Sequence, residues 1–94
     1  MLSYQIRHDA EMYCMVNKLG YELHMTGHYW QLNNCQAWIH EAYVVDKVTG
    51  EFIPALVLQS YETLVCIKIG NEYHVTRKYS TTTSKQVTTF KRLY

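Results

Sequence analysis

The sequence predicts an α+β protein, with an antiparallel sheet of about four to five strands, an N-terminal helix and a C-terminal helix. Amphipathic helical periods lie near both ends of the chain. Between them, residues 37–79 are rich in β-branched and aromatic side chains and are interrupted by turn signals. Helices that are separated from strands along the chain, rather than alternating with them, are typical of α+β folds.

The first helix is predicted over residues 9–19. Asp9 is a suitable N-cap, because its carboxylate can accept a backbone N–H that has no partner within the helix. Apolar residues then recur at i, i+3, i+4 and i+7: Met12, Met15, Val16 and Leu19. Gly20 follows at the position where a left-handed residue commonly ends a helix.

The segments on either side of this helix carry weaker patterns. Residues 2–7 are expected to form a short leading strand. Residues 21–36 show no clean period and contain Gly27, so they are expected to form short strand and loop pieces.

Four strands are predicted in the middle of the chain: residues 37–46, 51–59, 60–69 and 72–79. Residues 46–50 form a turn signal between the first two. Pro54 cannot donate to a strand ladder, so its strand is expected to begin after it or to lie at an edge. Gly70 and Asn71 form a two-residue hairpin loop, with Gly suited to the first position of a type II′ turn.

Strict alternation within residues 60–69 assigns a face to each side chain. Leu64 and Cys66 are expected to face one side of the sheet. The other side is expected to receive Val65, Ile67 and Ile69.

The final helix is expected to begin at Thr83 or Ser84. Its apolar side consists of Val87, Phe90 and Tyr94. The opposite side is polar and basic, and consists of Lys85, Thr88, Thr89 and Arg92.

Length and charge limit the function classes. The 94 residues suit a single domain, 1–94, and the net charge of +1 argues against a strongly basic nucleic-acid binder. That total conceals an asymmetry. Residues 1–64 carry three basic and seven acidic side chains, a net charge of −4, whereas residues 65–94 carry six basic and one acidic, a net charge of +5. Opposite patches on identical chains attract, so a homo-oligomer is one expectation.

Two segments resemble motifs of a known family. Residues 60–65 (SYETLV) resemble an S-Y-x-T-x-V strand, and residues 79–86 (YSTTTSKQ) resemble a Y-S-x-T-T-S-[KR]-H element that opens a helix. Gln86 departs from the His of that pattern. These motifs recur together in small proteins of unknown function from phages, plasmids and integrated elements of Gram-positive bacteria.

The resemblance implies a genomic setting, which is a mobile element acting in the cytoplasm of its bacterial host. Small proteins of this setting are mostly binders of host enzymes, defence nucleases or nucleic acid. It therefore implies a non-enzymatic inhibitor of a host macromolecule, for which a CRISPR–Cas effector is the leading candidate (an anti-CRISPR type). The partner would be a host protein or a protein–nucleic-acid complex.

The basic carboxyl-terminal region is the predicted interaction surface. Cations and hydroxyls gather there: Arg77, Lys78, Tyr79, Thr82, Thr83, Ser84, Lys85 and Arg92. Such groups can bind phosphate or an acidic protein surface. A small nucleic-acid-binding module is therefore the alternative function. The other interpretation gives this region no binding role: the hydroxyls only cap the helix, and the cations form a solvated face.

Metal binding and catalysis have weaker support. His24, His28, Cys35 and His40 are acceptable zinc ligands in a loose spacing, so a structural zinc is the one cofactor considered. Cys66 lies within a strand, where a thiol usually packs as a small apolar side chain. The sequence shows no catalytic set and no apolar stretch long enough to span a membrane, so neither an enzyme nor a membrane protein is expected.

Overall fold

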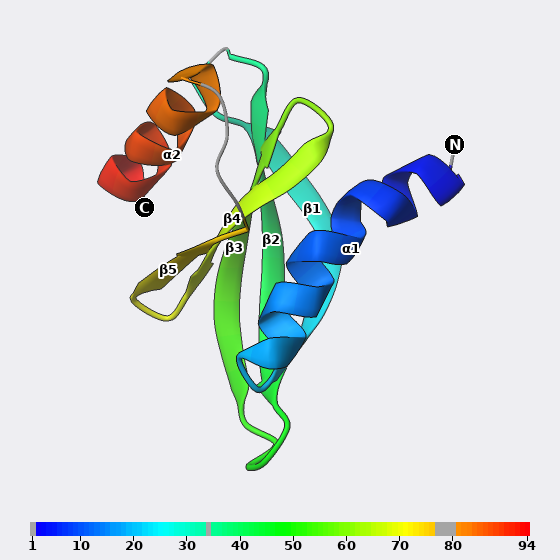
Figure 1. Ribbon diagram of the computed structural model, residues 1–94. Helices are drawn as coiled ribbons and strands as arrows, with labels where there is room; N and C mark the ends of the chain where they lie inside the picture. The colour runs from blue at the N-terminus through cyan, green and yellow to red at the C-terminus, as the bar shows by residue number, and fades with distance from the viewer. Residues whose placement is uncertain (1, 34, 77–80) are drawn as a thin grey trace.

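The computed structural model describes residues 2–33, 35–76 and 81–94, with side chains from Ala10 onward. Its elements, in chain order, are α1 (Leu2–Lys18), β1 (Tyr21–Gln31), β2 (Ala37–Asp46), β3 (Phe52–Ser60), β4 (Thr63–Ile69), β5 (Glu72–Val75) and α2 (Thr81–Leu93) (Figure 1). The strands form one antiparallel sheet in the order β1-β2-β3-β4-β5. The predicted α+β class is confirmed.

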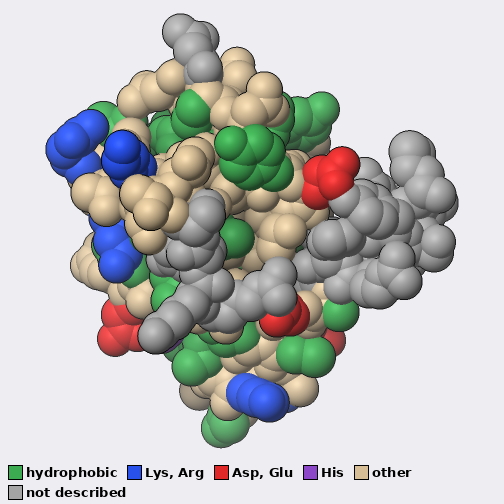
Figure 2. Space-filling model, turned by 45° about the horizontal axis from the view of Figure 1, so that its top comes forward, with side chains coloured by type: hydrophobic (Ala, Val, Ile, Leu, Met, Phe, Trp, Pro, Cys, Tyr) green, Lys and Arg blue, Asp and Glu red, His purple; other side chains and the backbone are tan. Residues whose placement is uncertain are grey.

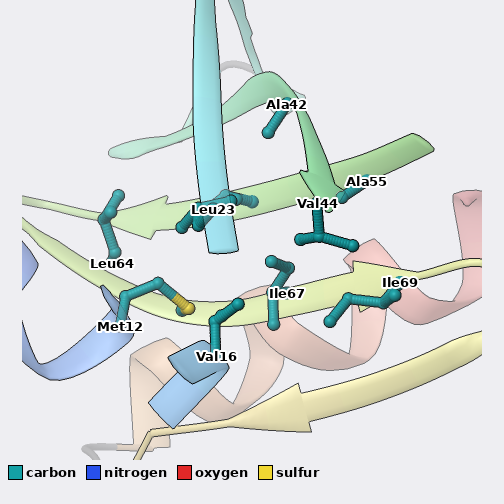
Figure 3. Close-up of a cluster of buried hydrophobic side chains, with 10 residues drawn as sticks. Met12, Val16, Leu23, Ala42, Val44, Ala55, Leu64, Ile67 and Ile69 are labelled. Atoms are coloured by element: carbon teal, nitrogen blue, oxygen red, sulfur yellow. The ribbon is translucent and has the colours of Figure 1, made fainter. Parts of the chain in front are cut away.

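Helix α1 packs on one face of the sheet. Met12 and Val16 are fully buried, and Met15 packs beside them, as the helical period predicts. The strand residues of this core are Leu23, Ala42, Val44, Ala55, Val57, Leu64, Ile67 and Ile69 (Figure 3). Leu19, the last member of the predicted stripe, lies beyond the end of the helix and is exposed.

Helix α2 packs on the opposite face through Val87 and Phe90. The other buried residues of this second core are Leu32, Ala37, Ile39, Leu58, Val65 and Cys66. Val57 belongs to the first core and its chain neighbour Leu58 to the second. Because successive strand side chains point to opposite faces, the two helices cover opposite faces of the sheet. Figure 1 shows them well apart.

The prediction for the start of the chain is wrong. Residues 2–7 form the beginning of α1 instead of a strand, so Asp9 lies inside the helix and is not its N-cap. No Gly or Pro separates residues 2–8 from the apolar period that follows, so nothing in the sequence stops the helix there. The helix ends at Lys18, one residue before the predicted end, and Gly20 takes the expected left-handed conformation, with φ = 96°.

Residues 21–36 contain a long strand, which the sequence analysis did not predict. The pairing of β1 with β2 shifts register between Met25 and Tyr29, and Gly27 within this irregularity has φ = 94°. A bulge changes which residues face each side, so the period-2 signal is lost over the strand as a whole.

The predicted strand over residues 60–69 divides into two parts. Ser60 ends β3, a turn follows, and β4 begins at Thr63. Tyr61 has φ = 57°, an unusual conformation for a bulky residue, and its N–H donates to Gln36 O at 2.8 Å.

The predicted faces of β4 are correct for Cys66, Ile67 and Ile69, and wrong for Leu64 and Val65. The register shift next to Leu58 places Val65 and Cys66 together in the α2 core. Leu64 therefore shares the α1 core with Ile67 and Ile69.

The remaining turn predictions agree with the structure. Asp46 Oδ1 accepts hydrogen bonds from the N–H groups of Val48 and Thr49, at 2.8 and 3.1 Å. These bonds lower the pKa of that carboxyl. Gly70 has φ = 60°, as a type II′ hairpin turn requires. The prediction for Pro54 is wrong, because β3 begins at Phe52, before the proline, and lies between β2 and β4 instead of at an edge. Pro54 is tolerated there because it lies one residue beyond the first registered pair of β3 with β4, so its missing N–H breaks no bond of that ladder.

Helix α2 begins at Thr81, two residues before the predicted start. Neither α1 nor α2, as far as the structure describes them, has the length and apolar composition of a membrane span.

Candidate binding surface

The amino end of α2 is fixed by a buried polar network. Ser60 Oγ donates to Gln86 Oε1 at 2.5 Å and lies 2.9 Å from Thr83 Oγ1. All three side chains are buried. The two sequence motifs of the chain meet here, because Ser60 opens the first and Thr83 and Gln86 belong to the second. Gln86 supplies a hydrogen-bond acceptor at the position where the motif has His.

The carboxyl end of α2 is fixed by aromatic contacts and hydrogen bonds. Trp30 Nε1 donates to the Tyr94 hydroxyl at 2.9 Å, and Lys68 Nζ donates to Tyr94 O at 2.6 Å. The Tyr94 ring also contacts the Phe90 ring, with a centroid separation of 5.8 Å. Lys91 Nζ lies 5.7 Å from the centre of the Tyr73 ring. Both ends of α2 are therefore attached to the sheet.

The outer face of α2 presents the polar and basic groups that the sequence predicts for it. Thr82, Ser84, Lys85, Thr88 and Arg92 are all exposed. The helix contains no Asp or Glu, and the ion pairs found among the described residues join His to Glu only. Figure 2 shows basic side chains gathered on the flank where α2 lies. This face can contact an anionic partner without first breaking an internal ion pair.

The structure modifies the predicted surface in two respects. Thr83 is only 6% exposed and bonds internally, so it supports α2 rather than facing a partner. Arg77, Lys78 and Tyr79 lie outside the described residues. The described part of the predicted surface therefore consists of Thr82, Ser84, Lys85 and Arg92.

The four candidate zinc ligands do not converge. The His24 ring stacks on Tyr43, whereas His40 Nε2 lies 2.6 Å from Gln59 Oε1. His40 and Tyr43 are three residues apart on β2, so His24 and His40 lie on opposite faces of the sheet. Cys35 Sγ donates to Leu32 O at 2.8 Å.

His28 also makes a contact of its own, since its ring lies against Trp30. More generally, no group of three or more His, Cys, Asp or Glu within the described ranges is arranged to hold a metal ion.

The most buried thiol is unsuited to nucleophilic chemistry. Burial raises the pKa of the Cys66 thiol to about 11, although the charge of Lys91 opposes this shift. The thiol is therefore protonated at neutral pH, whereas the nucleophilic form is the thiolate. Cys66 packs in the α2 core, as the sequence analysis expects of a mid-strand thiol.

Sequence reasoning missed a groove on the part of the sheet face that α2 leaves uncovered. Its volume is about 620 Å³. The residues that line it come from all strands except β5 and from the β4–β5 turn: Thr26, Glu41, Ala42, Tyr43, Phe52, Ile53, Pro54, Ala55, Leu56, Lys68, Gly70 and Asn71. The signal that could have revealed it is the alternation of Glu41 and Tyr43 with Ile39 on β2, which places all three on one face.

Residues 15–93 match a protein family described as a family of unknown function (DUF8033). The matched range contains the last part of α1, the whole sheet and α2. No curated protein and no solved structure matches the chain.

Proposed function

We propose, for a chain that belongs to the family of unknown function DUF8033, a non-enzymatic role: it binds and inhibits a host macromolecule through the outer face of α2. The observation that carries this proposal is the exposed array of hydroxyls and cations on that face. Lys85 and Arg92 lie seven residues apart, about two helical turns, and Ser84 and Thr88 lie between or beside them.

The rigidity of α2 supports a binding role. Ser60 and Gln86 fix its amino end, and Trp30 and Lys68 fix the residue that follows its carboxyl end. A surface that is ordered before binding loses less conformational entropy on association than a mobile one. The hydroxyl and charged groups of α2 therefore need little rearrangement to meet a partner.

The inhibitory part of the proposal is supported by the sequence motifs. Their resemblance to proteins of Gram-positive mobile elements favours action in the cytoplasm of a bacterial host. A CRISPR–Cas effector with its guide RNA is the first partner to test, because it combines protein and phosphate surfaces. Both kinds of surface suit the side chains of α2.

The test is co-elution of the purified protein with a Cas9-type effector–guide complex on size exclusion, together with target DNA cleavage. Lys85→Glu combined with Arg92→Glu should weaken binding and inhibition at least about tenfold, because two contacts become repulsive. The matched control is Lys18→Glu combined with Lys47→Glu, which makes the same charge change away from α2 and should stay within about twofold. Absence of co-elution, or equal loss in both variants, contradicts the proposal.

A nucleic-acid-binding module is the second candidate. It is favoured by the hydroxyls of Thr82 and Ser84 next to Lys85, since hydroxyl and ammonium groups both contact phosphate oxygens. Fluorescence anisotropy with a labelled duplex across a salt series tests it. Each phosphate contact contributes about −0.9 to the slope of log K against log salt for B-DNA. The Lys85→Glu, Arg92→Glu variant should flatten that slope by roughly 2, and an unchanged slope would reject this candidate.

A further inference from the structure

The groove occupies a part of the sheet that no described helix covers. α1 packs on the opposite face, and α2 covers the part of the same face that holds Ile39 and Leu58. β2 and β3 continue past α2 (Figure 1). On that continuation Glu41 and Tyr43 follow Ile39 on one face of β2, and Leu56 precedes Leu58 on β3. The groove and α2 therefore lie on the same side of the sheet.

A row of three aromatic rings crosses this uncovered area. The Tyr43 ring stacks between the rings of His24 and Phe52, with centroid separations of 5.0 and 5.3 Å. Phe52 is 67% exposed although its ring is large and apolar. Pro54, next along the same side of β3, is exposed too. A continuous exposed apolar and aromatic patch of this kind is typical of an interaction site.

The two charged residues that line the groove, Glu41 and Lys68, lie apart from each other on different strands. Glu41 pairs with Leu56 across β2 and β3, and Leu56 pairs with Lys68 across β3 and β4. Two strand spacings separate Glu41 from Lys68, which is about 10 Å between their backbones. Thr26 Oγ1 donates to Glu41 Oε1 at 2.9 Å and so orients the carboxylate. Lys68 already donates to Tyr94 O, at the end of the groove near α2.

We propose that this groove binds an extended segment of a partner protein in which one Lys or Arg side chain stands between apolar residues. The cation pairs with the Glu41 carboxylate, which favours a positive charge. The apolar residues on either side of that Lys or Arg in the partner segment pack against Pro54 and Leu56. This inference rests on the proposed function, and it identifies the partner as a protein.

Charge complementarity separates this occupant from a nucleic acid. Beside the aromatic row, a phosphate backbone would be repelled by Glu41 and by Glu22, which lies 2.9 Å from His24, whereas the groove's cation, Lys68, lies at the end near α2 and donates to Tyr94 O. A protein can present a basic segment to the groove and an acidic area to α2 at the same time. The two patches of opposite character on one side of the sheet therefore suit a protein surface.

The test uses short blocked peptides that alternate valine and glycine around one central residue, which is Arg, Gln or Glu. Each is titrated into the ¹⁵N-labelled full chain and followed by amide chemical shifts. The Arg peptide should shift β2 and β3 amides around Glu41 and Leu56, and should bind at least about fivefold more tightly than the Gln peptide, because only Arg forms a charge-assisted pair with Glu41. The Glu peptide should bind more weakly still.

Three variants make the test specific. Glu41→Gln should remove the preference for Arg over Gln, while Glu62→Gln, an equal change at another exposed acid, should keep it. Lys85→Glu combined with Arg92→Glu should bind the Arg peptide as the unmodified chain does. Failure of the α2 proposal and failure of the groove proposal are thus distinguishable. Dispersed amide spectra show that each variant is folded.

Three results would overturn the inference. The first is equal affinity for the Arg and Gln peptides, or shifts that map away from the groove. The second is a poly(dT) oligonucleotide that shifts the groove amides more strongly than the Arg peptide, because the occupant would then be a nucleic acid. The third is a set of groove shifts that grow with protein concentration alone, with a matching mass increase in light scattering, because the occupant would then be a second copy.

Discussion

Replacing Ser60 with Ala tests whether the buried polar network fixes α2 to the sheet. The substitution removes the donor that Gln86 Oε1 accepts from at 2.5 Å, in a site where Ser60, Thr83 and Gln86 are 4%, 6% and 6% exposed. A buried acceptor that loses its donor costs about 1–3 kcal/mol, because little water reaches it to replace the bond. For a domain of this size, that corresponds to a decrease in Tm of about 5–20 °C.

The assay is urea unfolding followed by tryptophan fluorescence, with circular dichroism as a second probe. Trp30 is a suitable reporter because it bonds to Tyr94, the residue that follows α2. The control, Ser84→Ala, removes a hydroxyl from the exposed side of the same helix and should change the unfolding free energy by less than about 0.5 kcal/mol. Adding Gln86→Leu to Ser60→Ala should recover part of the loss, because neither polar partner then remains.

Two outcomes would refute this reasoning. One is a Ser60→Ala protein within about 0.5 kcal/mol of the unmodified chain, which would mean that the network contributes no more than an exposed hydroxyl. The other is an equal loss in Ser84→Ala, which would assign the effect to helix α2 in general.

Four other predictions concern the core, the thiols and metal. Phe90→Ala empties a fully buried site in the α2 core and should lower the unfolding free energy by about 3–5 kcal/mol in the same titration; a loss under about 1 kcal/mol would contradict the packing described. At pH 8 a thiol reagent should label the exposed Cys14 and spare Cys66 until the chain unfolds, whereas equal labelling would contradict the burial of Cys66. The Cys66 pKa of about 11 lies above the ordinary value of 9.0, so its contribution to stability is complete below pH 9 and is lost as the pH rises toward 11. Between pH 9 and pH 11, the urea midpoint of the unmodified chain should therefore fall relative to that of a Cys66→Val variant. Midpoints that change in parallel with pH would refute the coupling between Cys66 ionisation and stability. Finally, EDTA should leave Tm unchanged, and a decrease of several degrees would favour the zinc hypothesis.

The class of fold could be predicted because each major element carries its own local signal. Met12, Met15 and Val16 place α1 on the sheet, and Gly70 sets the β4–β5 hairpin. Two of the errors occur where a bulge interrupts the period of a strand. The irregularity at Gly27 hides the continuity of β1, and the irregularity next to Leu58 exchanges the faces of Leu64 and Val65. A bulge adds a residue without a compositional signature strong enough to override alternation.

The candidate surfaces were predictable to different extents. The outer face of α2 follows from helical period alone, so the exposure of Lys85 and Arg92 agrees with the sequence. The burial of Thr83 does not follow from the helical period, because it depends on contact with Ser60, 23 residues earlier in the chain. The groove also depends on the tertiary arrangement. Glu41 and Lys68 line the same groove because β3 pairs with both of their strands. No local sequence pattern specifies that pairing.

The order of the strands has a consequence for synthesis on the ribosome. Each strand pairs with its neighbour in the sequence, so the growing chain can add hairpins in turn, and a hairpin forms in about 1–10 μs. Helix α2 differs, because it packs on Leu58 and Ile39, and Tyr94 beyond it bonds to Trp30, 64 residues away. A partly synthesised chain therefore leaves the Phe90 side of the sheet bare. The protein therefore acquires its basic outer surface and conceals its second core in the same late event, which also ends the exposure of that core to aggregation.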